Sequence, residues 1–578
     1  MDSLQTKQFR KNEQISLKIE DLTEEGAGVG KVDGFPFFVK DTVPGDVVVA
    51  SVTRVKKNYA FARLVQIVQP SRDRVDARCP VAKSCGGCQL QELSYERQLF
   101  FKENKVRNHL IRIGGFEAEE VDARMHRVIG MEKPFRYRNK AQVPFATDKD
   151  GRLICGFYAG RTHAVIRMQD CVIGIAENEQ ILQTIRFYAE RFHIPAYNEQ
   201  TGKGVLRHVL IRKGFHTGQI MVCLVVHRKE ETSLPHQDQL ITELVKIKGM
   251  TSISLNYNRK QTNVIMGETG KTIWGRDVIE DTLLDLRFLI SPLSFYQINP
   301  VQTEVLYKTV ISCAALQGDE TVWDLYCGIG TISLALAAAM RDRKKEGGRV
   351  FGIEVVEQAV RDARENAQAN DIQNVTFYEG KAEELLPKLK GKELPPPDLI
   401  VVDPPRKGCA QETLQTMLEA EPGRIIYVSC DSATLARDLR ILVDGGYRLQ
   451  LVQPVDMFPQ TVHVETVVLL SHKKPDGHIN VKVEFGEGEG KVPLDNIAKR
   501  AEEYMPKERV TYKMIKEYIE AKYGFKVHTA YIAEVKRDLG LPMYDAPNAV
   551  EELKQPRKHP TAEKVEAIKD ALKHFEVI

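Results

Sequence analysis

The chain has 578 residues, too many for one hydrophobic core, and its length predicts about three or four domains. Its 82 Lys and Arg residues nearly balance 79 Asp and Glu residues, giving a net charge of +3, so any binding of nucleic acid must rely on local basic patches. The sequence contains neither an apolar run of roughly 18 residues nor an N-terminal signal core. We therefore expect a cytoplasmic protein whose ten cysteines are reduced.

Short alternating strands interrupted by glycine fill residues 12–68, and this pattern predicts a small β-barrel of the OB type. The segment EGAGVGK, the PGD of residues 44–46 and the basic-aromatic turn KKNYAF (56–61) resemble a TRAM domain, an RNA-binding module. Lysines attract phosphate and aromatic rings stack on bases, which suits single-stranded RNA. We assign residues 1–70 to this domain, and an ordinary barrel with a solvated face is the alternative.

Three cysteines follow in CPVAKSCGGCQ with C-x5-C-x2-C spacing. Cys79, Cys85 and Cys88 can converge on one metal centre, which needs a fourth ligand. Of the nearest candidates, Cys155 and Cys171, we choose Cys171 because it follows an apparent strand, HAVIRMQ, in a short loop. Ligation by sulfur alone fits either zinc or an iron-sulfur cluster, and the spacing does not choose between them.

A mostly β central domain is predicted for residues 71–286, with one charged helix over 93–122 that can pack on the catalytic domain. The segment KPFRYRNKAQVPF (133–145) places four cations around Phe135 and Tyr137, and a second basic strand, GVLRHVLIRKG, follows. Arginine grips phosphate while rings stack on splayed bases, so we interpret the first segment as an RNA-backbone patch. A solvated strand face is the alternative.

Regular alternation of strands and helices begins near residue 287 and predicts a doubly wound, Rossmann-like α/β domain over 287–472 that binds a nucleoside-containing cofactor. In DLYCGIG, Gly328 and Gly330 stand where the backbone must approach the ligand, and Glu354 at the next strand end can accept ribose hydroxyls. Ser333 replaces the third glycine of the dinucleotide fingerprint, so a close approach to a pyrophosphate is not specified.

Three later apolar runs, LIVVD, RIIYV and VETVVLL, are predicted to be buried strands of a parallel-type sheet. Asp403, Cys430 and Glu465 stand at their ends, where open α/β sheets place their sites, so we expect one pocket. Nicotinamide dehydrogenases share the glycine loop and the later acid. The sequence DPPR (403–406), however, resembles the acidic-Pro-Pro signature of amino-group and base methyltransferases, and S-adenosylmethionine has no pyrophosphate.

Methylation of C5 of uracil is demanding because that carbon is a poor nucleophile. A thiolate that adds to C6 makes an enolate whose C5 attacks the sulfonium methyl group, and a base must then remove the C5 proton so that the thiol can leave. Cys430 and Glu465 supply the required thiol and carboxylate. A free thiol with a pKa of about 8.5 is mostly protonated, so the loop must lower the pKa of Cys430 or deprotonate it on binding.

The motifs SFYQIN, DLYCGIG, DPPRKG, YVSC and HVE occur in order as in the bacterial 5-methyluridine RNA methyltransferase family, which this chain resembles over roughly residues 12–471. The resemblance implies a seven-stranded methyltransferase domain in which Cys430 is the nucleophile and Glu465 the proton acceptor, with Asp403 also able to touch the uracil edge. It further implies that S-adenosyl-L-methionine is bound by Gln297, Tyr326, Glu354 and Asp403.

In that family a cysteine cluster of this spacing holds a 4Fe-4S cluster, and the resemblance implies the same, with a structural role, for Cys79, Cys85, Cys88 and Cys171. The TRAM domain and the cysteines accompany 23S rRNA enzymes more often, so we expect a monomer that modifies 23S rRNA rather than the tRNA T-loop. Two other classes stay open. A cytosine methyltransferase is expected to carry a cysteine where this chain has Arg406, and a non-catalytic RNA-binding iron-sulfur protein does not require Cys430 and Glu465 together.

Residues 473–490 are predicted to be a linker, and residues 491–578 a helical extension that departs from the family pattern. Three apolar stripes at helical spacing define its helices. They are Ile515, Tyr518 and Ile519; Ile532, Val535 and Leu539; and Val565, Ile568, Leu572 and Phe575. We hypothesise a helix-turn-helix-like module that adds RNA affinity, and a partner-binding bundle is the alternative.

Overall fold

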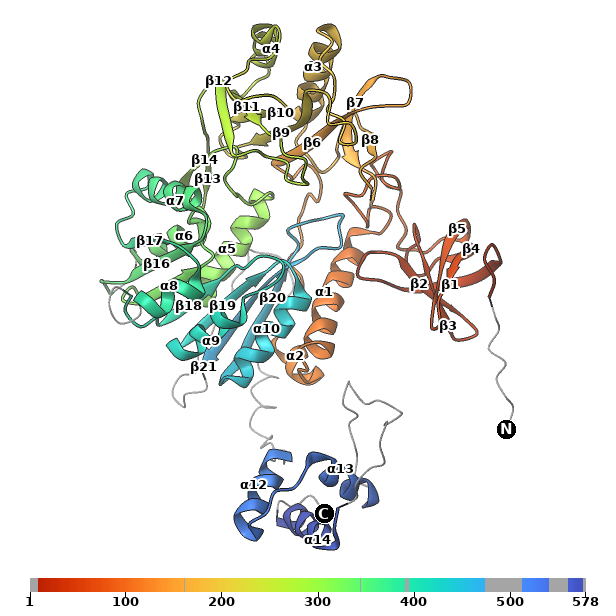
Figure 1. Ribbon diagram of the computed structural model, residues 1–578, viewed down its shortest axis with the longest axis vertical. Coiled ribbons are helices and arrows are strands. Elements are labelled where there is room, and N and C mark those ends of the chain that lie inside the picture. Colours follow the sequence, from red (N-terminus) through yellow and green to blue (C-terminus); the bar gives the residue numbers. More distant parts are fainter. Residues whose placement is uncertain are drawn as a thin grey trace. The chain divides into compact units, whose positions relative to one another are not determined.

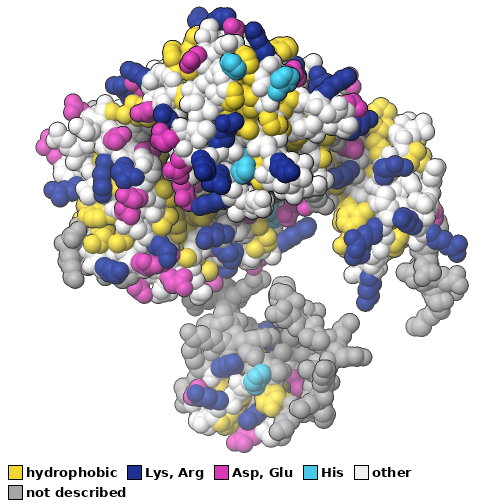
Figure 2. Space-filling model, turned by 45° about the horizontal axis from the view of Figure 1, so that its top comes forward, with side chains coloured by type: hydrophobic (Ala, Val, Ile, Leu, Met, Phe, Trp, Pro, Cys, Tyr) yellow, Lys and Arg dark blue, Asp and Glu magenta, His cyan; other side chains and the backbone are white. Residues whose placement is uncertain are grey.

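The structure, a computed structural model (Figure 1), divides the chain into two compact units, Met1–Val483 and Glu484–Ile578. It describes residues 9–160, 162–341, 343, 345–389, 394–472, 512–539 and 560–574. Among the helices in these ranges, none is both long enough and apolar enough to cross a membrane. Figure 2 shows Lys and Arg side chains intermixed with Asp and Glu side chains, as the small net charge of +3 implies.

A closed five-stranded barrel begins the first unit, in the order β1-β2-β3-β5-β4. Its strands are β1 (Gln14–Leu22), β2 (Gly28–Val32), β3 (Phe35–Val39), β4 (Val47–Val55) and β5 (Ala60–Gln69). Alternate residues of β1 point inward, so that Ile15, Leu17 and Ile19 join Phe37 and Val48 in the core. The predicted barrel is thereby confirmed.

The central region forms a second sheet of seven strands, in the order β12-β11-β10-β9-β6-β7-β8 (Figure 1). Its strands are β6 (Lys140–Thr147), β7 (Leu153–Tyr158), β8 (Val165–Arg167), β9 (Leu206–Lys213), β10 (Ile220–Val226), β11 (Met250–Tyr257) and β12 (Thr269–Gly275). Helices α3 (Glu177–Arg191) and α4 (Gln237–Leu244) accompany them, and the hairpin β13 (Ile279–Leu283) and β14 (Leu286–Ile290) follows. The mostly β central region is confirmed.

The predicted single helix over 93–122 is wrong, because the structure has α1 (Tyr95–Arg112) and a separate α2 (Ala118–Arg124). Gly114 and Gly115 separate them. Gly115 has φ +65°, a left-handed conformation that ends a helix and that glycine adopts without strain. Helix α1 then packs along α10 (Ser432–Asp444).

Two residues of the predicted RNA-backbone patch have structural roles. Tyr137 is 2% exposed and its hydroxyl donates to the carbonyl of Pro459 (2.9 Å), so its ring is not free to stack on a base. Arg136 forms an ion pair with Asp170 and donates to the carbonyl of Cys171 (3.0 Å). The interpretation of Tyr137 as an RNA contact is therefore wrong, whereas Arg136 stays partly exposed and its assignment stays a prediction.

The catalytic sheet has seven strands in the order β17-β16-β15-β18-β19-β21-β20, as predicted for a Rossmann-like methyltransferase domain. The strands are β15 (Thr321–Leu325), β16 (Arg349–Glu354), β17 (Val375–Glu379), β18 (Leu399–Val402), β19 (Arg424–Ser429), β20 (Tyr447–Val455) and β21 (Glu465–His472). The helices are α5 (Pro300–Ala314), α6 (Thr331–Arg341), α7 (Glu357–Ala369), α8 (Ala382–Leu389), α9 (Gln411–Ala420) and α10 (Ser432–Asp444).

Strand β21 is antiparallel to both of its neighbours, which corrects the expectation of a parallel strand. Its register pairs Thr466 with Ser429, the last residue of β19. An antiparallel strand brings its first residue to the edge where its neighbour ends. Glu465 therefore begins its strand beside the point where Cys430 follows β19.

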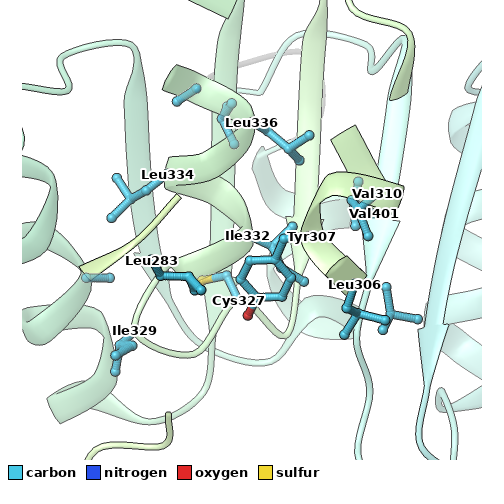
Figure 3. Close-up of a cluster of buried hydrophobic side chains, with 14 of the residues drawn as sticks. Leu283, Leu306, Tyr307, Val310, Cys327, Ile329, Ile332, Leu334, Leu336 and Val401 are labelled. Carbon is cyan, nitrogen blue, oxygen red and sulfur yellow. The ribbon is translucent and has the colours of Figure 1, made fainter. Parts of the chain in front are cut away.

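One hydrophobic core joins the glycine-loop side of this sheet to the hairpin and α5 (Figure 3). Tyr307 of α5 lies beside Cys327 in this cluster, with Leu306 and Ile332 close by. Cys327 and Cys409 are both buried, so neither is presented to a ligand. The core holds the strand ends rigid beneath the site.

The second unit contains α12 (Tyr512–Tyr523), α13 (Thr529–Asp538) and α14 (Ala562–His574) around one small core. The predicted stripes supply most of that core: Ile515, Ile519, Ile532, Val535, Ile568 and Leu572 are buried. Leu539 is 38% exposed, because α13 ends at Asp538, so its assignment to a stripe is wrong. Phe575 and the predicted linker 473–490 lie outside the described residues.

Candidate active site

Cys430 occupies the turn between β19 and α10. Asp431 caps that helix, because its Oδ1 accepts hydrogen bonds from the main-chain N–H groups of Ala433 and Thr434, both at 3.0 Å. Cys430 is partly buried and lines a cleft of about 620 Å³. The other walls of this cleft include barrel residues, Cys85 and Cys88, and residues of α1.

Glu465 is 4% exposed, and its Oε2 atom has no hydrogen-bond partner in the described residues. Burial raises the pKa of Glu465 well above its usual value, and the charge of Asp403 raises it further, whereas Arg406 opposes the rise. Burial also raises the pKa of Asp403 to about 7. Two close carboxyl groups in a dry site do not both ionise readily, so each disfavours the charged form of the other.

Burial raises the pKa of Cys430 to about 12, and the nearby carboxylates of Glu465 and Asp403 add to the rise. The positive charge of Arg406 acts in the opposite direction. Of the two routes to a thiolate, a lowered pKa in the free protein is therefore wrong.

Tyr307 is a residue of the site that the sequence did not indicate. Its hydroxyl shares a hydrogen bond of 2.6 Å with Thr331 Oγ1. Burial raises the pKa of Tyr307 far above its usual value, and the charges of Asp403, Asp324 and Glu465 raise it as well. The phenol thus lies among three acidic groups. The sequence carries no indication of this position, because a tyrosine inside an amphipathic helix is common.

The glycine loop and the end of β16 form a second part of the site. Glu354 accepts hydrogen bonds from the main-chain N–H groups of Gly328 (3.0 Å) and Val356 (2.9 Å). Gly328 has φ +55°, and a Cβ atom there would meet nothing within 4 Å, so open space adjoins the loop. Val355 and Val356 are exposed beside it and offer an apolar surface.

Asp324, at the end of β15, adds a buried carboxyl group that the sequence analysis did not single out. Ser333 Oγ donates to its Oδ2, so the residue that replaces the third glycine fixes this side chain. Asp324 Oδ1 has no hydrogen-bond partner in the described residues. Burial raises the pKa of Asp324 to about 7.

Gln297 and Tyr326 are held differently. The carbonyl of Gln297 accepts a hydrogen bond from Asn139 Nδ2 (3.1 Å), which ties its loop to the central sheet. Tyr326 has φ +67°, an uncommon value for a non-glycine residue, and its hydroxyl shares a hydrogen bond of 3.2 Å with Thr413. Its main-chain N–H donates to the carbonyl of Ile353 (3.0 Å), so it follows β15 directly into the glycine loop.

The four selected cysteines lie near one another. Burial raises the pKa of Cys88 to about 12, and the charges of Cys171, Cys85 and Cys79 contribute. The pKa of Cys155 is raised by burial and lowered by nearby arginines, without a contribution from these thiols. In the described part of the chain, no three His, Cys, Asp or Glu side chains converge closely enough to hold a single metal ion.

Comparisons with known proteins cover most of the first unit. The family model described as tRNA (Uracil-5-)-methyltransferase matches residues 198–473, and the model of the TRAM domain matches residues 8–65. The chain is 47% identical over 462 residues to an RNA methyltransferase of Listeria monocytogenes, covering 80% of this chain and 98% of that protein. It is 47% identical over 472 residues to an RNA methyltransferase of Halalkalibacterium halodurans, covering 82% of this chain and 100% of that protein.

A similar solved structure is that of Pyrococcus abyssi tRNA (uracil-54, C5)-methyltransferase in complex with S-adenosyl-L-homocysteine. It is 28% identical to this chain and superposes with a TM-score of 0.62, covering 79% of this chain and 100% of that one. The similarity therefore extends well beyond the nucleotide-binding half of the fold.

Proposed function

Since this chain belongs to the tRNA (uracil-5-)-methyltransferase family and is an RNA methyltransferase with a TRAM domain, we propose that it methylates C5 of a uridine through a covalent bond to Cys430. The observation that carries the proposal is the meeting of Cys430, Glu465 and Asp403 at one edge of the sheet. A thiol beside a buried carboxyl group is the pair that this reaction requires.

The strand ends fit S-adenosyl-L-methionine as the methyl donor. Glu354 stands where the ribose hydroxyls would bind, and the exposed Val355 and Val356 would face the adenine. Asp324, with its unpartnered Oδ1, and Asp403 are acidic groups that suit the positive charge of this donor. The methyl group that it supplies is electrophilic because it is bonded to a sulfonium. Gln297 and Tyr326 complete the proposed set of ligands.

The chain's own residues perform the remaining steps. When the uracil binds, Cys430 gives its thiol proton to solvent water, and its Sγ forms a bond to C6 while the π electrons of the C5–C6 bond move toward the C4 carbonyl oxygen as an enolate. After C5 is methylated, Glu465 accepts the C5 proton. The electron pair of that C–H bond restores the C5–C6 double bond, and the Sγ–C6 bond breaks. The raised pKa of Glu465 suits a group that must accept a proton in this step.

Cys79, Cys85, Cys88 and Cys171 would hold a 4Fe-4S cluster. The support is a set of four sulfur donors, close enough for neighbouring thiol charges to raise the pKa of Cys85, Cys88 and Cys171, together with the resemblance to the family. We assign the cluster the structural role of fixing this loop.

The proposed substrate is 23S rRNA, on the grounds that the TRAM domain and the cysteines accompany rRNA enzymes of the family. A tRNA T-loop uridine is the second candidate, because the similar Pyrococcus abyssi enzyme is a tRNA (uracil-54, C5)-methyltransferase. In either RNA the base lies within a folded structure, so it must be extruded into the site. Mass spectrometry of rRNA and tRNA from a deletion strain distinguishes the two.

RNA that contains 5-fluorouridine tests the covalent route, because fluorine at C5 cannot be removed as a proton. We expect an adduct that survives denaturing electrophoresis and maps to Cys430, and we expect none from Cys430→Ala. Methylation of uridine RNA without any adduct on the fluorinated RNA would overturn the proposal.

A further inference from the structure

The connection between β20 and β21, residues 456–464, leads directly into Glu465, and we name it the base loop. Its carbonyl groups are held by side chains of α1, of α5 and of the segment before β6. The donors are Gln302 Nε2 to Asp456, Asn299 Nδ2 to Met457, Lys102 Nζ to Phe458, Tyr137 Oη to Pro459 and Lys105 Nζ to Val462, at 2.9 to 3.2 Å. Few of these groups are free to move without breaking a buried hydrogen bond.

Gln460 is the most constrained residue of the base loop. It is 2% exposed and has φ +71°, a left-handed conformation that non-glycine residues adopt only when their surroundings hold them. Its side chain and main chain both pair with Gln98 of α1, which is 1% exposed. Gln460 N–H donates to Gln98 Oε1 (3.0 Å), and Gln98 Nε2 donates to Gln460 Oε1 (3.1 Å).

The carbonyl of Gln460 connects this pair to the cysteine loop, which we define as residues 79–90. It accepts hydrogen bonds from the main-chain N–H groups of Gln89 (3.1 Å) and Leu90 (3.0 Å), the residues that directly follow Cys88. Gln98 Nε2 also donates to the carbonyl of Leu90 (3.0 Å). Val462 packs with Leu90 in a small hydrophobic cluster. The cysteine loop and the base loop thus share one buried hydrogen-bond network.

We propose that Gln98 and Gln460 are positioning residues that fasten the base loop to the cysteine loop, so that proton removal by Glu465 depends on how the cysteine loop is folded. The inference rests on the proposed function. According to this proposal, the four-cysteine site affects catalysis indirectly. A fixed cysteine loop holds the main-chain N–H groups of Gln89 and Leu90 in place, and these N–H groups hold the base loop that leads to Glu465.

The proposal separates the two halves of the reaction. Cys430 is placed by β19 and by the Asp431 cap, so the position of the nucleophile does not depend on the hydrogen bonds of the base loop. Removal of the C5 proton does depend on the base loop, because Glu465 must stand within reach of that proton. A loosened base loop should therefore leave methylated uridine attached to Cys430.

The direct test is Gln98→Met, which keeps the side chain's length and removes its hydrogen bonds, with ordinary uridine RNA as substrate. We expect kcat to fall on the order of 10-fold to 100-fold, KM to fall with it so that kcat/KM changes little, and a covalent, methylated RNA adduct to accumulate. Gln460→Asn should behave alike, since asparagine tolerates positive φ but does not reach Gln98. Asn256→Leu is the matched control, a buried amide bonded to Gly267 and Thr269 in the central sheet, and should give no adduct.

Two results would overturn the inference. One is a loss of kcat in Gln98→Met and Gln460→Asn without adduct, and the other is turnover equal to that of the control. If the wild-type protein forms no adduct with 5-fluorouridine RNA, the proposed function itself is contradicted. The two failures are therefore distinguishable.

Hydrogen exchange provides a readout that does not involve activity. In Cys88→Ala, which loosens the cysteine loop, we expect amides 460–464 to exchange at least about tenfold faster than in the wild type, while amides of β18 stay unchanged. Unchanged exchange across the base loop would contradict the coupling.

Discussion

The two groups proposed to carry the reaction are held in different ways. Cys430 is fixed by its own neighbourhood: a buried parallel strand ends, and Asp431 caps the next helix through residues two and three positions later. Glu465 follows a loop held by segments far away in sequence, such as Lys102, which is 354 residues from its partner Asp456. The nucleophile therefore depends on local structure, whereas the base depends on the assembly of the whole first unit.

Glu465→Gln tests the base side of this comparison most strongly. The amide cannot accept the C5 proton, so turnover should fall by about 10²-fold to 10⁴-fold. Because Cys430 is untouched, denaturing electrophoresis with ordinary uridine RNA should detect a methylated adduct. A variant that neither turns over nor forms adduct would place Glu465 before the methylation step rather than after it.

Lys102→Met tests the distant contacts. Lys102 and Asp456 are fully buried partners (2.5 Å), and removing one leaves an unpaired buried charge, so the free energy of unfolding of the first unit should fall by about 3–5 kcal/mol. Urea denaturation measures this loss. Lys308→Met, which breaks an exposed pair with Glu304, is the control and should cost under about 0.5 kcal/mol. Equal losses of unfolding free energy in the two variants would show that the buried pair does not stabilise the first unit more than the exposed pair does.

Asp431→Ala tests the local contacts on the nucleophile side. It removes the cap of α10, so we expect a loss of about 1 kcal/mol and a modest reduction in the rate of adduct formation with 5-fluorouridine RNA. The release of product should be unaffected because the base loop is intact. Accumulation of adduct on uridine RNA would show that the two sides are not separate.

The pH profile sharpens the comparison at the site itself. Burial raises the pKa of Glu465, and a base acts only when it is deprotonated, so kcat should rise with pH above the usual titration range of a carboxyl group, up to about tenfold per unit. Asp403 raises that pKa, so Asp403→Asn should shift the rising limb to lower pH whatever its effect on the absolute rate. If the rising part of the pH–rate profile does not shift in Asp403→Asn, the group that titrates is not Glu465.

Local signals in the sequence identified most of the fold. Glycine-interrupted strands predicted the barrel, and alternating strands and helices predicted the Rossmann-like sheet. The errors arose where local pattern was ambiguous. The apolar run after Glu465 has no feature that distinguishes a parallel from an antiparallel strand, and the two glycines that divide 93–122 look like a simple end of one helix.

The sequence by itself determined the chemical inventory: a thiol, an acid and a glycine loop, each at the end of a strand, together with three clustered cysteines. Only the tertiary structure decided how the base is held, because Gln98, Lys102 and Tyr137 contact residues hundreds of positions away and no local pattern marks such partners. It also decided that the pKa of Cys430 rises rather than falls, since burial and neighbouring charge are properties of the folded chain.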